Sequence, residues 1–177
     1  WPSISWASID YYGNKKAFHY KLSEMYAPIL LGMDEKENGK YNIWVSNDLQ
    51  RDIKGRIRVL VEDMKGNQMF AFSEVVDIKA NSCFRLNENV RINVSKKKRT
   101  ECYARIILME EDTVLSERLH FFAYPKDLKL VKTELEPKVT FADGKYTLEF
   151  NSKVFVKDVF VSTTEAGEFS RNFFDVL

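Results

Sequence analysis

The sequence predicts a mainly β protein with one short helix near its start. Residues of alternating polarity recur from Ala27 onward, whereas apolar residues at helical spacing occur only before that point. Turn-forming pairs such as Asn38-Gly39 and Asp143-Gly144 separate the alternating runs. Hydrophobic residues make up 45% and charged residues 30% of the 177-residue chain, which fits an ordinary globular chain of one or two domains.

Residues 1–25 predict a turn followed by a single amphipathic helix. Gly13 interrupts the preceding segment, and Asn14 is the expected N-cap. The apolar stripe of the helix consists of Phe18, Leu22 and Met25. Because a lone helix of about a dozen residues is marginal in water, we expect this stripe to lie on the next domain. The chain opens without Met, and we expect it to begin inside a larger parent protein.

Residues 26–125 predict an immunoglobulin-like β-sandwich. One strand places Tyr41, Ile43 and Val45 on a dry face and Trp44 on the opposite face, and the stretch 56–62 alternates in the same way. Lys65-Gly66-Asn67 and Glu110-Glu111-Asp112 are expected turns. About seven strands in roughly 100 residues are what such a sandwich requires.

Residues 126–177 predict a partial second immunoglobulin-like domain. Pro125-Lys126-Asp127 interrupts the strand pattern, and a hairpin at Asp143-Gly144 follows, with Tyr146, Leu148 and Phe150 expected to point inward. A complete sandwich uses about 100 residues, so we expect strands to be missing and a β edge to be open. That edge could pair with a second copy of the chain.

Several classes of function are excluded by composition. The 27 basic and 26 acidic residues are spread along the chain, which predicts no nucleic-acid partner. No apolar run approaches the roughly 18 residues of a membrane span. Cys83 and Cys102 lack a C-x-x-C spacing and a nearby histidine pair, so no metal and no cofactor are expected. Two buried thiols are favoured over a disulfide.

Three clusters resemble functional sites but have simpler explanations. Glu110-Glu111-Asp112 lies between two strands, where a solvated turn is expected in place of a catalytic carboxylate pair. The Lys96-Lys97-Lys98-Arg99 run has no interleaved aromatics, which favours a solvated loop over an anion-binding patch. His19 and His120 have no Ser or Cys motif beside them and are expected to pack.

Trp44 is the aromatic residue for which two roles stay open. It falls on the face of its strand that should be wet, and a large hydrophobic side chain there needs a cover. One interpretation is that the N-terminal helix or a neighbouring domain covers the ring. The other is that the ring is an exposed platform for binding a sugar.

Three stretches carry a resemblance to a known family. WPSISWASIDYYG and the helix after it are similar to the last strand-to-helix segment of the catalytic barrel in β-mannosidases, whose glycoside hydrolase family also holds β-galactosidases and β-glucuronidases. Residues 45–49 resemble the start of the first C-terminal immunoglobulin-like domain of that family, and residues 169–177 resemble a motif of the second. Lys15 and Arg171 depart from the family pattern, which often has Trp and Asp there.

The resemblance implies that this chain is the C-terminal region of a retaining glycoside hydrolase. The two catalytic Glu residues of the family lie on barrel strands that would precede Trp1, so no catalytic residue is assigned here. By resemblance, Trp1 lies at the rim of the parent's active site. The implied partner is the parent's own catalytic barrel, and the implied tasks are structural support and subunit contacts. By resemblance, the family has periplasmic, secreted and lysosomal members, which favours a location outside the cytoplasm but leaves the compartment open.

Two other functions are kept open. The first is a carbohydrate-binding module, with Trp44 as its sugar platform. The second is an immunoglobulin-like adhesion domain unrelated to glycosidases, since sandwiches host many functions.

Overall fold

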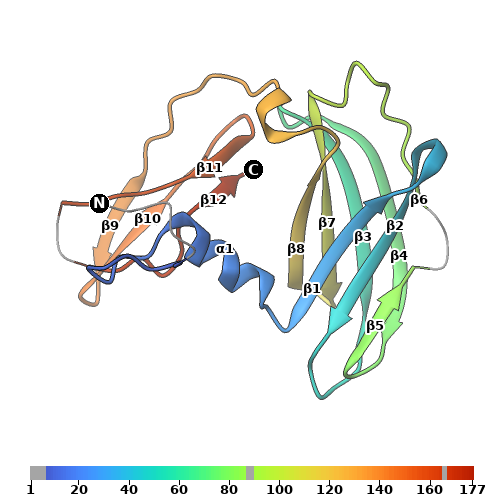
Figure 1. Ribbon diagram of the computed structural model, residues 1–177, viewed down its shortest axis with the longest axis horizontal. Helices are drawn as coiled ribbons and strands as arrows, with labels where there is room; N and C mark the ends of the chain where they lie inside the picture. The colour runs from blue at the N-terminus through green and yellow to red at the C-terminus, as the bar shows by residue number, and fades with distance from the viewer. Residues whose placement is uncertain (1–6, 87–89, 165–166) are drawn as a thin grey trace. The chain divides into compact units, whose positions relative to one another are not determined.

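The structure is a computed structural model that describes residues 7–86, 90–164 and 167–177. Strands dominate it, which confirms the predicted mainly β class. The chain forms two compact units (Figure 1). The sandwich unit is Ala27–Lys129, and the terminal unit combines Trp1–Tyr26 with Leu130–Leu177.

Two antiparallel sheets make up the sandwich unit (Figure 1). The first has the order β1-β2-β5, with β6 also pairing with β2. The second has the order β4-β3-β7-β8. The strands of the first sheet are β1 (Ile29–Glu35), β2 (Lys40–Asn47), β5 (Ser82–Arg85) and β6 (Val90–Arg91). Those of the second are β3 (Ile53–Asp63), β4 (Gln68–Ile78), β7 (Cys102–Glu110) and β8 (Thr113–Phe121).

The core of this unit lies between the two sheets and follows from the alternating pattern. Tyr41, Ile43 and Val45 on β2 are buried, and so are Ile57 and Val59 on β3. All five belong to one hydrophobic cluster to which both sheets contribute. The predicted sandwich is therefore confirmed, and its described part has eight strands where about seven were expected.

The predicted turns connect these strands. In the β3–β4 turn, the Asp63 carboxylate accepts hydrogen bonds from the backbone N–H groups of Lys65 and Asn67. Gly66 supplies the positive φ of 82° that closes this turn. Glu111 is the left-handed residue of the β7–β8 turn, with φ at 52°. A short 3-10 helix, η1 (Glu37–Gly39), joins β1 to β2.

The terminal unit contains one helix, α1 (Ala17–Met25), and two antiparallel two-stranded sheets among its described residues. Strands β9 (Lys138–Ala142) and β10 (Lys145–Glu149) form one sheet. Strands β11 (Val156–Val159) and β12 (Phe174–Val176) form the other. A 3-10 turn, η2 (Pro125–Asp127), lies in the sandwich unit where the strand pattern was predicted to break.

One expectation about the helix is wrong. Its N-cap is Lys16 and has no side-chain cap. Asn14 instead donates its side-chain amide to Asp10, whose carboxylate also accepts the Asn14 backbone N–H. Phe18 is 51% and Met25 58% exposed, and the expectation that this stripe lies on the next domain stays a prediction. No helix of the described chain is long and apolar enough to cross a membrane.

The prediction that Tyr146 and Leu148 of the β9–β10 hairpin point into a core is also wrong. Tyr146 is 71% exposed, and Leu148 is only half-buried. Tyr146 pairs with Phe141 across the β9–β10 ladder, with ring centroids 4.6 Å apart. The alternation places Val139, Phe141, Tyr146 and Leu148 on one face as expected, but nothing in the described unit buries that face.

Candidate functional site

The carboxylates with shifted pKa values, including Glu110 of the acidic triplet, are held by hydrogen bonds near the surface. Arg51 donates two hydrogen bonds to the Glu110 carboxylate, at 3.0 and 2.8 Å, and holds its pKa below the ordinary value. In the described part of the chain, every carboxyl group with a shifted pKa has it lowered: Asp10, Asp52, Asp63, Glu101 and Glu110. A glycosidase acid needs the opposite shift, since it must hold its proton near neutral pH.

Trp44 packs on its own sheet. It pairs with Gly32 in the β1–β2 register, and the Cε2, Cζ2 and Nε1 atoms of the indole occupy the space that a Cβ at Gly32 would need. The side chain is half-buried as a result. Sequence reasoning considered a cover from the helix or another domain and missed this one, because strand register cannot be read from a single strand.

Trp1, the predicted rim residue, lies outside the described residues.

A buried asparagine lies in each of the two motifs, residues 45–49 and 169–177, that resemble the immunoglobulin-like domains of the glycoside hydrolase family. Asn47 is fully buried; its amide donates to the carbonyls of Arg51 and Lys79 and accepts the Leu49 N–H. Asn172 accepts the Val161 N–H and donates to the Val161 carbonyl. Each motif thus has a structural role: its buried asparagine forms hydrogen bonds with backbone groups that would otherwise be unpaired.

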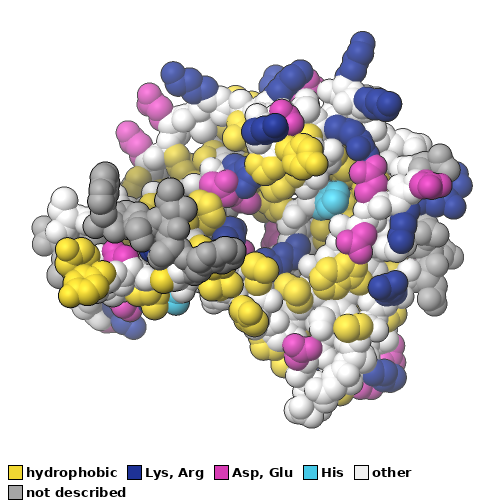
Figure 2. Space-filling model, in the orientation of Figure 1, with side chains coloured by type: hydrophobic (Ala, Val, Ile, Leu, Met, Phe, Trp, Pro, Cys, Tyr) yellow, Lys and Arg dark blue, Asp and Glu magenta, His cyan; other side chains and the backbone are white. Residues whose placement is uncertain are grey.

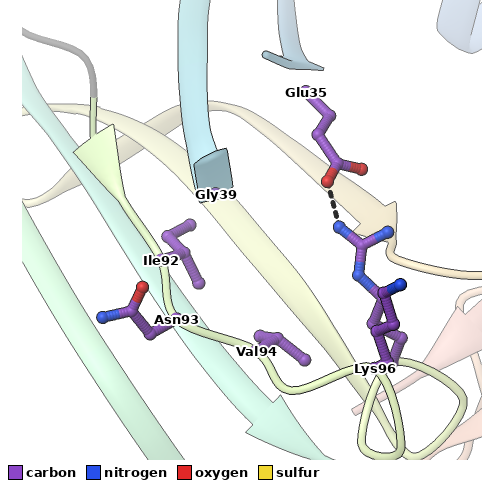
Figure 3. A pocket seen from close by; sticks show the side chains of 7 residues that line it. Glu35, Gly39, Ile92, Asn93, Val94 and Lys96 are labelled. Atoms are coloured by element: carbon purple, nitrogen blue, oxygen red, sulfur yellow. Dashed lines mark hydrogen bonds and ion pairs between the residues drawn. The ribbon is translucent and has the colours of Figure 1, made fainter. Parts of the chain in front are cut away.

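A shallow groove lies at the end of the sandwich unit where β1 stops and the loop after β6 begins. Its volume is about 340 Å³, and its lining is Glu35, Gly39, Ile92, Asn93, Val94, Lys96 and Arg99. The segment after β6 is fixed by a hydrogen bond of 3.0 Å from the Ile92 N–H to the Gly39 carbonyl. In Figure 3 the Val94 side chain lies between Asn93 and Lys96, Ile92 lies between Gly39 and Asn93, and Glu35 comes from the end of β1.

An ion pair closes one side of this groove. The Arg99 Nη2 group donates to Glu35 and, at 3.3 Å, to the Tyr41 hydroxyl. The Glu35 hydrogen bond raises the pKa of Arg99, and burial raises that of Tyr41. Lys96, Lys97 and Lys98 are exposed, as predicted for a solvated loop, whereas Arg99 is half-buried. Figure 2 shows Lys and Arg side chains at the surface over the loop that follows β6.

Tyr41 connects this ion pair to His120. The Tyr41 and His120 rings meet edge-on at 5.8 Å, and Phe122 lies 5.3 Å from the His120 ring. Burial lowers the pKa of His120. The expectation that His120 is a packing residue agrees with these contacts.

The two cysteines have different environments. Both are free thiols, as predicted, but Cys83 is exposed, so the expectation of two buried thiols is half wrong. Cys102 is buried, and burial raises its pKa to about 11. Cys83 is exposed because its position on the short strand β5 has the opposite parity to Phe84, which is half-buried. Among the described residues, no three His, Cys, Asp or Glu side chains could hold a metal ion.

Comparison with known proteins decides the family. The model of the mannosidase Ig/CBM-like domain matches residues 39–127, half of the chain. The chain belongs to the mannosidase Ig/CBM-like domain family. An Ig-fold domain model matches residues 130–177 as well, so both predicted immunoglobulin-like parts correspond to known families.

Curated relatives of this mannosidase Ig/CBM-like chain are glycosidases. β-Mannosidase A of Aspergillus oryzae is 25% identical over 169 residues, which cover 87% of this chain and 18% of the relative. β-Mannosidase B of Aspergillus clavatus is 27% identical over 71 residues, 33% of this chain and 8% of the relative. The chain thus spans less than a fifth of the length of these relatives.

Solved structures show the same fold. The crystal structure of a β-D-mannosidase from Dictyoglomus thermophilum matches with a TM-score of 0.83 at 22% identity, over 99% of this chain and 21% of that one. An exo-β-D-glucosaminidase matches with a TM-score of 0.52 at 12% identity, over 85% of this chain and 17% of that one. The resemblance to the C-terminal region of a β-mannosidase-like glycoside hydrolase is therefore confirmed.

Proposed function

We propose that this chain is the non-catalytic, immunoglobulin-like region of a retaining glycoside hydrolase whose substrates end in β-D-mannose. The observation that carries the proposal is the match to β-mannosidase A, which extends over 87% of this chain and leaves more than four-fifths of the relative unmatched. The catalytic Glu pair belongs to that unmatched part in this account.

The carboxylates of the chain support the non-catalytic part of the proposal. A retaining pair needs two carboxyl groups about 5 Å apart, one with a raised pKa. Glu110, from the acidic triplet, is neutralised by Arg51. Its lowered pKa suits a surface ion pair and would leave it without a proton to donate near neutral pH.

The exposed apolar surfaces of the terminal unit support a role in holding domains or subunits together. Phe18 and Met25 expose one stripe of α1. Phe141 and Tyr146 expose one face of the β9–β10 hairpin, at 61% and 71% of their surface. Apolar surface of this kind is typical of contact sites. In this account, the α1 stripe meets the catalytic part of the parent and the hairpin makes a contact between subunits.

Carbohydrate binding at Trp44 is the second candidate, and one observation favours it. The indole is half-buried, so part of the ring remains accessible on the outer face of β2. Its contact with Gly32 holds the ring in one place, as a stacking platform requires.

Tryptophan fluorescence separates the two candidates. The chain and its Trp44→Phe variant are titrated with mannose, mannobiose and soluble mannan; phenylalanine retains an aromatic ring over Gly32. A structural region gives no saturable change in emission for either protein. Saturable quenching in the unmodified chain that disappears in Trp44→Phe would replace the structural proposal with a sugar-binding module.

A further inference from the structure

The groove beside the Glu35–Arg99 ion pair combines three kinds of surface. Lys96 and the Nη1 group of Arg99 are cationic donors that have no hydrogen bond within the described chain. Asn93 adds an exposed amide. Val94 adds an aliphatic floor, and Ile92 also lines the groove but is buried. At about 340 Å³, the groove has the size of a small-ligand site.

The charge around the groove favours an anion. Residues 90–99 carry five cationic side chains and no acidic one. Glu35 is the acidic group of the lining, and its carboxylate is held by Arg99. A carboxylate entering the groove would therefore meet two donors, Lys96 and Arg99, in a positive field.

The other lining groups favour a ligand that also has hydroxyls. The Asn93 amide both donates and accepts, and the second oxygen of Glu35 accepts, which suits hydroxyl groups. The C–H face of a sugar ring would lie on Val94, which is half-buried. A bare inorganic anion would leave that aliphatic floor unused.

We infer that this groove binds a carboxylate-bearing saccharide of the hexuronic acid type, with Lys96 and Arg99 on the carboxylate and Asn93 and Glu35 on the hydroxyls. The inference does not depend on the proposed function, because the groove lies on the sandwich unit and contains neither Trp44 nor a catalytic group.

Backbone-amide NMR titration of the full chain tests the inference, with sodium D-glucuronate as the probe. Saturable shifts centred on Gly39 and residues 92–99 are expected. The Lys96→Gln variant should bind about tenfold more weakly, because it loses a charge-assisted hydrogen bond. Lys97→Gln removes the same charge from the same loop but does not line the groove, so its affinity should stay within about twofold of the unmodified chain.

Two further ligands distinguish the chemistry. Sodium acetate has the carboxylate without the ring, and methyl mannoside has the ring without the carboxylate, so both should bind more weakly than glucuronate. Acetate binding as tight as glucuronate binding would show that the groove is a simple anion site. Methyl mannoside binding as tight as glucuronate binding would show that Lys96 and Arg99 do not contribute. Either result would overturn the inference, and so would the absence of shifts at the groove or an equal loss in Lys96→Gln and Lys97→Gln.

Discussion

Gly32 and Trp44 face each other across the β1–β2 ladder, and the indole lies in the space that any side chain at position 32 would need. The missing side chain of the glycine on β1 thus leaves room for the indole of the tryptophan on β2. This contact fixes the indole without help from another domain.

The Gly32→Ala substitution should destabilise the sandwich unit. Its Cβ would overlap the indole, and overpacking of this kind costs about 1–3 kcal/mol of unfolding free energy. Urea unfolding followed by circular dichroism measures the change. Adding Trp44→Leu should recover part of the lost stability, because the smaller side chain frees the space. The control Gly167→Ala adds a methyl group in open space and should leave stability unchanged. A Gly32→Ala chain as stable as the unmodified one would contradict the described contact.

Asn47→Ala should destabilise the same unit by about 1–3 kcal/mol. The substitution leaves the Leu49 N–H and the carbonyls of Arg51 and Lys79 without their partner. Asn42→Ala, on the same strand but on its outer face, should change stability by less than about 0.5 kcal/mol. Equal effects of the two substitutions in urea unfolding would show that the Asn47 hydrogen bonds contribute little.

His120 should make the sandwich unit less stable in mild acid. Burial lowers its folded-state pKa below the ordinary 6.5, so the unfolded chain binds the proton more readily. Stability from this group is complete above about pH 6.5 and falls as the pH drops towards the folded-state value. The nearby Asp34 and Glu35 oppose the shift, and Arg99 adds to it.

Urea unfolding between pH 5 and pH 8, about the ordinary histidine pKa, tests this dependence. The unmodified chain should lose more stability towards pH 5 than His120→Gln does. His19→Gln, in the terminal unit, controls for the loss of a histidine. Parallel pH profiles for the unmodified chain and His120→Gln would contradict the lowered pKa.

The apolar face of the β9–β10 hairpin should cause self-association. Phe141 and Tyr146 form its exposed ring pair, and both outer edges of the two-stranded sheet are unpaired in the described structure. In sedimentation velocity, the sedimentation coefficient should rise with the concentration of the chain, and this rise should disappear when both residues are changed to Ser. Tyr124→Ser removes a similarly exposed ring from the sandwich unit and should leave the association unchanged. A chain that stays monomeric at all concentrations would rule out this contact.

Periodicity predicted the sandwich because each of its strands has one face in a shared core. The alternation at Tyr41, Ile43 and Val45 is sufficient to assign both the strand and its buried face. The same reasoning failed at Tyr146, where the alternation assigned the face correctly but could not say whether anything covers it. Burial is a property of the partner surface and not of the strand alone.

The contacts between distant segments were beyond single-strand reasoning. Arg99 meets Glu35 across 64 positions of sequence, and Arg51 meets Glu110 across 59. The glycine under Trp44 and the buried amide of Asn47 depend on strand register and loop closure in the same way. The motif containing Asn47 was noticed for its resemblance, although its physical role is to satisfy backbone groups.

Hydrolysis of an aryl β-D-mannoside by the purified chain tests the central claim most directly. We expect release of the aryl group at the rate of buffer alone, with an intact β-mannosidase as the positive control. Release in proportion to the concentration of the chain, and lost in Glu110→Gln, would contradict a non-catalytic region and place a catalytic carboxylate in these 177 residues.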